Sequence, residues 1–251
     1  MRNLKLTIAY DGCEFHGWQV QPERDTVQGL LAEAVERITG ERTLPQGSGR
    51  TDAGVHAEAQ VANLHVKSPI PCRGLQIALN DNLPQSIRVC SVEEVGPEFH
   101  ARKSAVAKTY RYRIYRGDVC SPFVARYVYH HPYPLDEIAM SEATGLVAGE
   151  HDFTSFAAVD PERGRDNGEV SNVRTIFSST LSRDGGELVY MVRGSGFLHH
   201  MVRNLVGTFL LVGKGTLKPA DVHRIIEARS RSANPGATAP ASGLCLISVE
   251  Y

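Results

Sequence analysis

Residues 47–57 read GSGRTDAGVHA, and this stretch restricts the fold more than any other part of the chain. It is not a P-loop, because such a loop ends in Gly-Lys-Ser/Thr. It is not a dinucleotide-binding fingerprint either, because Asp52 stands where a third glycine must allow close helix–strand packing. A plain glycine-rich turn capped by Asp52 is one interpretation. Small residues on both sides of Arg50-Thr51-Asp52 also suit a loop that a bulky ligand approaches closely.

The chain before residue 102 alternates between strand and helix patterns around this loop. Period-two alternation predicts half-buried strands at residues 3–10, 59–66 and 87–92. Apolar residues at helical spacing predict helices at residues 27–38 and 71–82. Asp25 with Gln28 resembles a capping box for the first helix, and Gly40 occupies its C′ position. The order is therefore β-α-loop-β-α-β.

The second part of the chain mixes strands and helices in a similar order. Strands are predicted at residues 106–116, 173–182, 187–193 and 244–251. Helices are predicted at residues 135–148, 198–213 and 219–229. Residues 160–168 are polar and predict a mobile surface loop. We expect an α+β protein of two mixed α/β subdomains, 1–102 with the Asp52 loop and 103–251.

Composition and cysteine usage are those of an ordinary soluble domain. The hydrophobic fraction is 42% and the charged fraction 22%, and no run of 18 apolar residues predicts a membrane span. The five cysteines are scattered and odd in number, without a C-x-x-C pair. A disulfide framework and a zinc ribbon are therefore not expected. We expect a cytoplasmic location.

The charge pattern indicates a local basic surface on a nearly neutral protein. The formal net charge is −1, and 21 of the 27 cationic residues are arginine. Arginine suits phosphate and base recognition, although a coding bias toward arginine explains the excess equally well. Residues 99–117 and 188–220 contain no acid but several arginines and lysines. Two such stretches predict one basic groove.

The Asp52 stretch and a collinear series of other blocks resemble the TruA family of pseudouridine synthases. Residues 49–56, GRTDAGVH, are similar to the catalytic loop of that family. The other similar blocks are Tyr10-Asp11-Gly12, Gly17-Trp18-Gln19, Asn80, Asn82-Leu83-Pro84, Phe99-His100-Ala101-Arg102, Lys108-Thr109-Tyr110-Arg111-Tyr112, 151–156, 197–204 and 239–244. The resemblance covers residues 4–251 in register. Cys13 and Glu14 lie at positions that are expected to vary in the family. The 160–168 loop differs from other members, which leaves the exact RNA substrate open.

The resemblance implies an isomerase that converts uridine to pseudouridine in the anticodon stem-loop of tRNA, at positions 38 to 40. It implies ferredoxin/RRM-like subdomains with antiparallel sheets flanking a central RNA-binding cleft. The reaction breaks the N1–C1′ bond, turns the base and joins C5 to C1′. It needs an oriented carboxylate that attacks carbon, and neither a metal nor another cofactor is expected. tRNA is the implied partner, and a homodimer is the family's common state.

Three catalytic roles follow from the resemblance. Asp52 is the expected nucleophile, and attack on C6 of the base or on C1′ of the ribose stays open. Arg203 is the expected ion-pair partner of that carboxylate, because a guanidinium favours the charged form; an exposed helix residue that binds solvent or phosphate is the alternative. Tyr110 is expected to stack on the flipped uracil and help to move the C5 proton. Strand alternation puts Tyr112 on the same face, where a packed aromatic is expected.

A uridine within a stem must be flipped out of its stack, at a cost of roughly a few kcal/mol. Arg50 is the candidate that fills the vacated space with its planar head. Leu244 is expected to form an apolar wall of the uracil site or to be an ordinary core residue of its strand. His199 and His200 are expected on a helix, pointing in different directions, so that phosphate contact or capping is favoured over a metal.

The basic stretch supplies further RNA-binding candidates, Arg102, Lys108 and Arg111. Two other interpretations remain open. One is an RNA-binding or RNA-folding protein that uses the same groove without chemistry. The other is an enzyme of the same chemistry that acts on other RNA positions.

Overall fold

The computed structural model describes residues 1–159 and 171–251, which form two compact units. Unit 1 consists of Met1–Lys108 and Cys245–Tyr251, and unit 2 consists of Thr109–Leu244. The polar loop predicted at 160–168 lies outside the described residues. No helix in the described part of the chain is long and apolar enough to cross a membrane.

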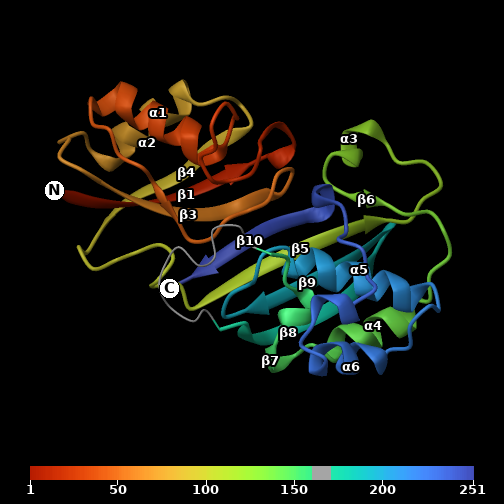
Figure 1. Cartoon of the computed structure of the whole chain (residues 1–251). Coiled ribbons are helices and arrows are strands. Elements are labelled where there is room, and N and C mark those ends of the chain that lie inside the picture. Colours follow the sequence, from red (N-terminus) through yellow and green to blue (C-terminus); the bar gives the residue numbers. More distant parts are fainter. Residues whose placement is uncertain (160–170) are drawn as a thin grey trace. The chain divides into compact units, whose positions relative to one another are not determined.

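Unit 1 is built on a sheet in which β1 (Arg2–Tyr10) is flanked on both sides (Figure 1). β3 (His56–Val66) and β4 (Ile87–Val95) run antiparallel to β1. β2 (Gln46–Gly47) pairs with β3 and is also antiparallel. Alternate residues of β1 are fully buried, as the period-two pattern predicts.

The C-terminal strand returns to unit 1. β10 (Leu244–Glu250) runs parallel to β3, with Cys245 opposite His56 and Leu246 opposite Ala57. The sequence placed this strand with the second subdomain, because strand patterns show no pairing partner. Pairing along β3 groups it with unit 1 in the structure, and the unit boundary falls after Lys108 rather than after residue 102.

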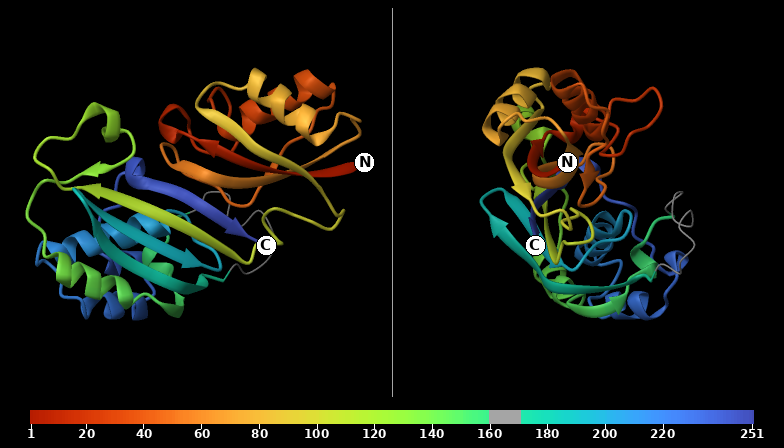
Figure 2. Two further views of the ribbon diagram at one scale, coloured as in Figure 1. Left: turned by 180° about the vertical axis from the view of Figure 1, so that it is seen from behind. Right: turned by 90° about the vertical axis from the view of Figure 1, so that its left-hand side faces the viewer.

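Two helices cover one face of the unit 1 sheet, α1 (Val27–Thr39) and α2 (Cys72–Asn82) (Figure 2). The N-cap of α1 is Thr26, whose Oγ1 accepts the Gly29 N–H at 3.3 Å. The predicted capping box started one residue too early, because Thr26 is the extended residue directly before the helix. The predicted C-terminal role of Gly40 is confirmed by its φ of 73°.

The part of the sheet in unit 2 has the strand order β5-β9-β8-β7. These strands are β5 (Ala107–Tyr115), β7 (Gly149–Asp152), β8 (Val173–Asp184) and β9 (Glu187–Gly194). β8 and β9 form an antiparallel hairpin whose turn contains Gly185 with a φ of 52°. β6 (Tyr129–His130) pairs with β5 in parallel.

The longer helices of unit 2 lie on one face of its sheet (Figures 1 and 2). They are α4 (Glu137–Gly145), α5 (Met201–Gly213) and α6 (Asp221–Glu227). Tyr190 of β9 packs edge-on against Phe209 of α5, with ring centroids 5.3 Å apart, in the centre of this core.

The predicted α+β fold of mainly antiparallel strands is confirmed. The predicted helices and strands are present, although α4 is shorter than 135–148 and α5 starts at Met201 instead of 198. The sequence missed the shortest elements, which span too few residues to show a period. They are β2, β6, β7, α3 (Pro122–Ala125) and the 3₁₀ helices Gly12–Glu14, Thr154–Phe156, Arg231–Ala233 and Ala241–Gly243.

Candidate active site

The loop that joins β2 to β3, residues 48–55, carries Asp52 and is called here the Asp52 loop. Buried side chains fix its first residues. The Ser48 N–H donates to Val61 O and the Ser48 hydroxyl donates to Gln60 Oε1, both at 2.7 Å. The Gln60 amide donates to Gly49 O at 3.0 Å. Because Ser48 and Gln60 are fully buried, water does not compete for these bonds.

The main chain on both sides of the Asp52 side chain is also held in place. Trp18 N–H donates to Thr51 O at 3.0 Å, and Val55 N–H donates to Asp52 O at 3.1 Å. The Tyr10 hydroxyl and Thr51 Oγ1 share a hydrogen bond of 2.8 Å. Burial raises the pKa of Tyr10 above its ordinary value, so this hydroxyl keeps its proton at neutral pH. The Asp52 side chain itself is half-buried.

Two glycines bring the N-terminal segment directly against the backbone of the Asp52 loop. A Cβ on Gly12 would lie 2.0 Å from Val55 O. A Cβ on Gly17 would lie 2.6 Å from Thr51 O, and the φ of Gly17 is +86°, which favours glycine. No larger residue fits at either position unless the loop moves.

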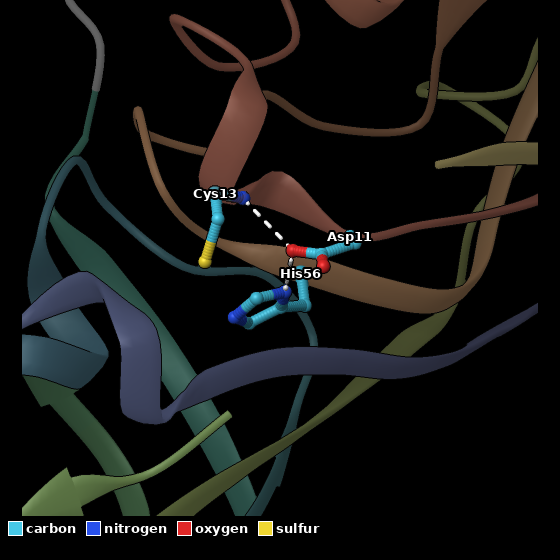
Figure 3. A group of neighbouring side chains, drawn as sticks. All are labelled: Asp11, Cys13 and His56. Atoms are coloured by element: carbon cyan, nitrogen blue, oxygen red, sulfur yellow. Dashed lines mark hydrogen bonds and ion pairs between the residues drawn. The ribbon is translucent and has the colours of Figure 1, made fainter. Parts of the chain in front are cut away.

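The far end of the loop is tied to the end of β1 by His56, as Figure 3 shows. Gly12 N–H donates to His56 Nδ1 at 3.0 Å, and Cys13 N–H donates to Asp11 Oδ1 at 3.0 Å. His56 Nδ1 also lies 3.3 Å from Asp11 Oδ1. Since Nδ1 accepts the Gly12 N–H, we assign the proton to Nε2, and the Asp11 contact is then not an ion pair.

Asp11, Cys13 and His56 are also of the residue types that hold metal ions, with one ligand atom of each within 4.8 Å of the others. The two backbone N–H groups already use lone pairs of the Asp11 carboxylate and of the His56 ring. The arrangement is therefore explained as a staple between β1 and β3.

Lys108 lies on the Asp52 loop rather than out in solvent. Its ammonium group donates to Ser48 O at 2.6 Å, and a Cβ on Gly49 would lie 2.9 Å from Lys108 Nζ. The sequence assigned Lys108 to RNA contact only, because a strand pattern gives no sign of a bond to a distant carbonyl. The other two unit 1 candidates, Arg50 and Arg102, have exposed side chains.

In unit 2, the β5 candidates lie on the two faces that alternation predicts. Tyr110 is 7% exposed and packs edge-on against Phe197, with ring centroids 5.0 Å apart. Arg111 is half-buried on the other face. Tyr112 is completely buried and donates its hydroxyl to Pro240 O at 2.8 Å, which confirms the packed aromatic expected there.

Arg203 lies in the first turn of α5 and is bound to the segment that precedes β10. Its Nε donates to Ala239 O at 2.7 Å, and Ala239 N–H donates back to Arg203 O at 3.2 Å. The guanidinium is therefore oriented by a backbone carbonyl and is not a fully exposed helix residue. Leu244 is 5% exposed at the start of β10, which fits an apolar wall and a core residue alike.

The sequence predicted that the two adjacent histidines lie on a helix, and this prediction is wrong. They form the turn before α5, and His200 is its N-cap residue with a φ of 58°. The turn brings the two rings together, with centroids 4.0 Å apart, so the prediction that they point in different directions is wrong. His199 Nδ1 lies 3.2 Å from Val159 O. Apolar periodicity from Leu198 onward concealed the change of direction before Met201.

Comparison with known proteins finds the same family over most of the chain. The family described as tRNA pseudouridine synthase matches residues 6–102 and 143–251. The chain belongs to this family. It is accordingly an isomerase that acts on tRNA.

Full-length relatives support this assignment. The chain is 54% identical over 251 residues to "tRNA pseudouridine synthase A" of Solibacter usitatus, and the alignment covers 100% of both chains. It is 45% identical to the protein of that name in Moorella thermoacetica, over 99% of both chains. For the protein of that name in Caldicellulosiruptor saccharolyticus the identity is 42%, over 100% of both. A solved structure titled "Crystal Structure of a Cbf5-Nop10-Gar1 Complex" aligns with a TM-score of only 0.36 and 11% identity, over 96% of this chain and 57% of that chain, and carries no argument.

The sequence analysis missed the residues that fix the Asp52 loop in unit 1 and the segment before β10 in unit 2. Tyr10, Gly12 and Trp18 lie in blocks that carried the resemblance, but the blocks alone gave them no task. Gln60 and Asn204 are fully buried polar residues on β3 and α5. One signal in the sequence was available for both residues. Each is polar but stands at a position that the apolar pattern of its strand or helix predicts to be buried.

Proposed function

We propose that this enzyme isomerises uridine at positions 38 to 40 of the tRNA anticodon stem-loop, with Asp52 as the nucleophile. The observation that carries the proposal is the fixation of the Asp52 backbone. Bonds at Thr51 O and Asp52 O hold the chain on both sides of a half-buried carboxylate. A nucleophile gains most from such positioning, because the ordering of the reacting groups is complete before the substrate binds.

The remaining roles are proposed on the family resemblance. Tyr110 stacks on the flipped uracil and helps to remove the C5 proton after the C–C bond has formed. Its packing against Phe197 supports a fixed ring orientation. Arg203 favours the ionised form of the nucleophile, and its bond to Ala239 O supports a fixed guanidinium. Arg50 fills the space left by the flipped base, and its exposed side chain is compatible with that role.

RNA contact by the basic residues and by the histidine turn is proposed as well. Arg102 and Arg111 contact the phosphate backbone, as does the turn of His199 and His200. Lys108 contributes by holding Ser48 O of the Asp52 loop, and Leu244 by an apolar contact to the base. We also propose a homodimer. Light scattering at micromolar concentration should give twice the mass of the 27.5 kDa chain, and a monomeric mass would contradict it.

Position mapping tests the substrate proposal directly. Four tRNA transcripts carry uridine at 38 only, at 39 only, at 40 only, or at none of these, with compensating changes in the stem. The native enzyme should form pseudouridine in the first three and none in the fourth. Product elsewhere in the RNA would contradict the proposed positions. Binding without product in any transcript would favour a protein that binds RNA without chemistry.

A further inference from the structure

One face of the unit 2 sheet, opposite the helices, has a distinct composition. On β9, Leu188, Tyr190 and Val192 are buried, and the alternate residues Met191 and Arg193 point to the other face. The acids of β5, β8 and β9 are Asp184 and Glu187, both at the hairpin end. Arg113 forms two bonds of 2.7 Å to the Glu187 carboxylate and neutralises it. The end of the hairpin near Arg193 has no acid on these three strands and carries the positive charge of Arg193.

A β-bulge re-aims an aromatic side chain at this positive end. Ile176 pairs with Gly194 and Ser178 pairs with Arg193, so Phe177 is an extra residue between two paired positions. Phe177 is 48% exposed. The neighbouring strand β7 begins at Gly149, opposite Ile176, and thus leaves the edge beside Phe177 uncovered by that strand.

Phe177 and Arg193 are in contact with each other. The guanidinium carbon of Arg193 lies 4.9 Å from the centroid of the Phe177 ring, which is cation–π geometry. Single exposed apolar residues are common and need no explanation. Here, however, a bulge, an exposed ring and a guanidinium that is ordered against it occur together, and the nearby Glu150 of β7 accepts a bond from Thr175 Oγ1 at 3.5 Å.

We propose that Phe177 and Arg193 form a binding site for one unpaired nucleotide of the RNA substrate, and this rests on the proposed function. The base stacks on the exposed part of the Phe177 ring, and the Arg193 guanidinium contacts the adjacent phosphate. Stacking suits any base, because each base has a π face. An unpaired nucleotide is required, because a base within a helix does not offer its face to a side chain.

The test compares RNA binding by matched variants. Phe177→Ala and Arg193→Lys are measured beside Phe123→Ala and Arg224→Lys, which change a 90% exposed phenylalanine of α3 and an exposed arginine of α6. Fluorescence anisotropy at constant salt gives Kd for a labelled unmodified tRNA transcript. Phe177→Ala should raise Kd about tenfold, as loss of one stacked base predicts. Arg193→Lys should raise it roughly threefold, because the charge remains and the planar group is lost. Both controls should stay within twofold of the native value.

A second probe separates stacking from general attraction to RNA. Phe177→Ala should weaken binding of a single-stranded oligonucleotide and leave binding of a fully paired RNA duplex unchanged. An unchanged Kd for tRNA would overturn the proposal, and the exposed ring would then point to a protein partner. An equal loss of affinity for duplex and single strand would overturn it as well. Thermal unfolding of each variant shows whether the fold is intact, and Phe177→Trp should restore binding if Phe177→Ala lowers stability. Native enzyme that forms no pseudouridine would count against the proposed function instead.

Discussion

Each unit contains one irregular segment whose backbone packs directly against a glycine, but different hydrogen bonds fix the two segments. The Asp52 loop of unit 1 meets Gly12, whose added Cβ would lie 2.0 Å from Val55 O. Residues 234–240 of unit 2, called here the Arg203 support, meet Gly207 of α5, whose added Cβ would lie 1.8 Å from Ala237 O. The Asp52 loop contains the proposed nucleophile, and the Arg203 support bonds to the side chain and the backbone of Arg203.

Buried hydrogen bonds hold both segments, but these bonds come from different elements. The Asp52 loop is held largely by the segment of residues 10–18 and by β3. The Arg203 support is held by a buried polar network, in which Asn234 Oδ1 accepts from Thr208 Oγ1 and from Gly236 N–H, both at 2.9 Å. Thr238 Oγ1 donates to Asn204 Oδ1 at 2.7 Å. We expect the Arg203 support to be coupled to global stability and the Asp52 loop to activity.

Gly207→Ala should have the largest effect on stability. The methyl group would collide with Ala237 O in a fully buried position, which should lower the free energy of unfolding by about 3 kcal/mol. Urea unfolding followed by circular dichroism gives the value. The control is Gly145→Ala in α4, where an added Cβ meets nothing within 4 Å. Equal stability of the two variants would show that the close approach to Ala237 does not matter.

Gly12→Ala should act on activity more than on stability. The added Cβ must displace Val55 O and with it the end of the Asp52 loop. A misplacement of this size costs on the order of 100-fold in rate. Single-turnover measurement of pseudouridine formation gives the effect, with Gly96→Ala, whose Cβ has nothing within 4 Å, as the control. A native rate in Gly12→Ala would break the proposed link between loop position and catalysis.

Tyr10→Phe should have a smaller effect, because it removes only the hydroxyl, with its bonds to Thr51 and from Gln60, and keeps the ring. Loss of the 2.8 Å bond to Thr51 Oγ1 should cost about 1 kcal/mol. A double-mutant cycle with Thr51→Val isolates the pair, and we expect a coupling free energy of about 1 kcal/mol from urea unfolding. Additive effects of the two changes would mean that this bond does not hold the loop.

Asp152→Asn tests the pH dependence of the segment that leads to Ser155, whose carbonyl accepts a bond from Asn234 of the Arg203 support. Burial tends to raise the pKa of Asp152, but bonds from the Thr154 hydroxyl and N–H, with Arg229 nearby, lower it overall. A carboxylate with a lowered pKa stabilises the fold above its unfolded pKa and loses that contribution as pH falls through its folded pKa. The native protein should therefore be about 1 kcal/mol more stable than the variant at pH 7.

The advantage should be lost as pH falls below 3.8, the ordinary pKa of an aspartate, since the carboxylate then takes up its proton. Unfolding midpoints of the two proteins above and below this pH give the comparison. A constant difference at all pH values would mean that ionisation of Asp152 contributes nothing.

The sequence predicted neither of the two glycine contacts. The glycines that flank a charged triplet in residues 47–57 indicated only a loop that a ligand approaches closely. Gly207 stands inside an apolar helical pattern, where one small residue gives no sign of the chain that crosses it. The same limit hid the bond of Lys108 to Ser48 O and the pairing of β10 with β3. Contacts between distant segments depend on the fold, and local patterns do not encode them.

Local patterns succeeded where the cause of the structure is itself local. Alternation along β5 correctly separated Tyr110 and Tyr112 from Arg111. Gly40 ends α1 as its left-handed conformation requires. The turn of His199 and His200 failed because apolar periodicity continues through it, while the left-handed φ of His200 redirects the chain. The roles of Asp52, Tyr110 and Arg203 rest on resemblance and stay predictions.

The central claim is that the Asp52 carboxylate performs the chemistry. A tRNA transcript with tritium at uridine C5 releases label when C5 bonds to C1′ and loses its hydrogen. We would measure release by the native enzyme, by Asp52→Asn and by Asp81→Asn, which changes an exposed carboxylate on α2. Each reaction would contain a chelator and no added cofactor. We expect release by the native enzyme and by Asp81→Asn, and none by Asp52→Asn although it still binds the RNA. Release by Asp52→Asn at the native rate would show that Asp52 is not the nucleophile.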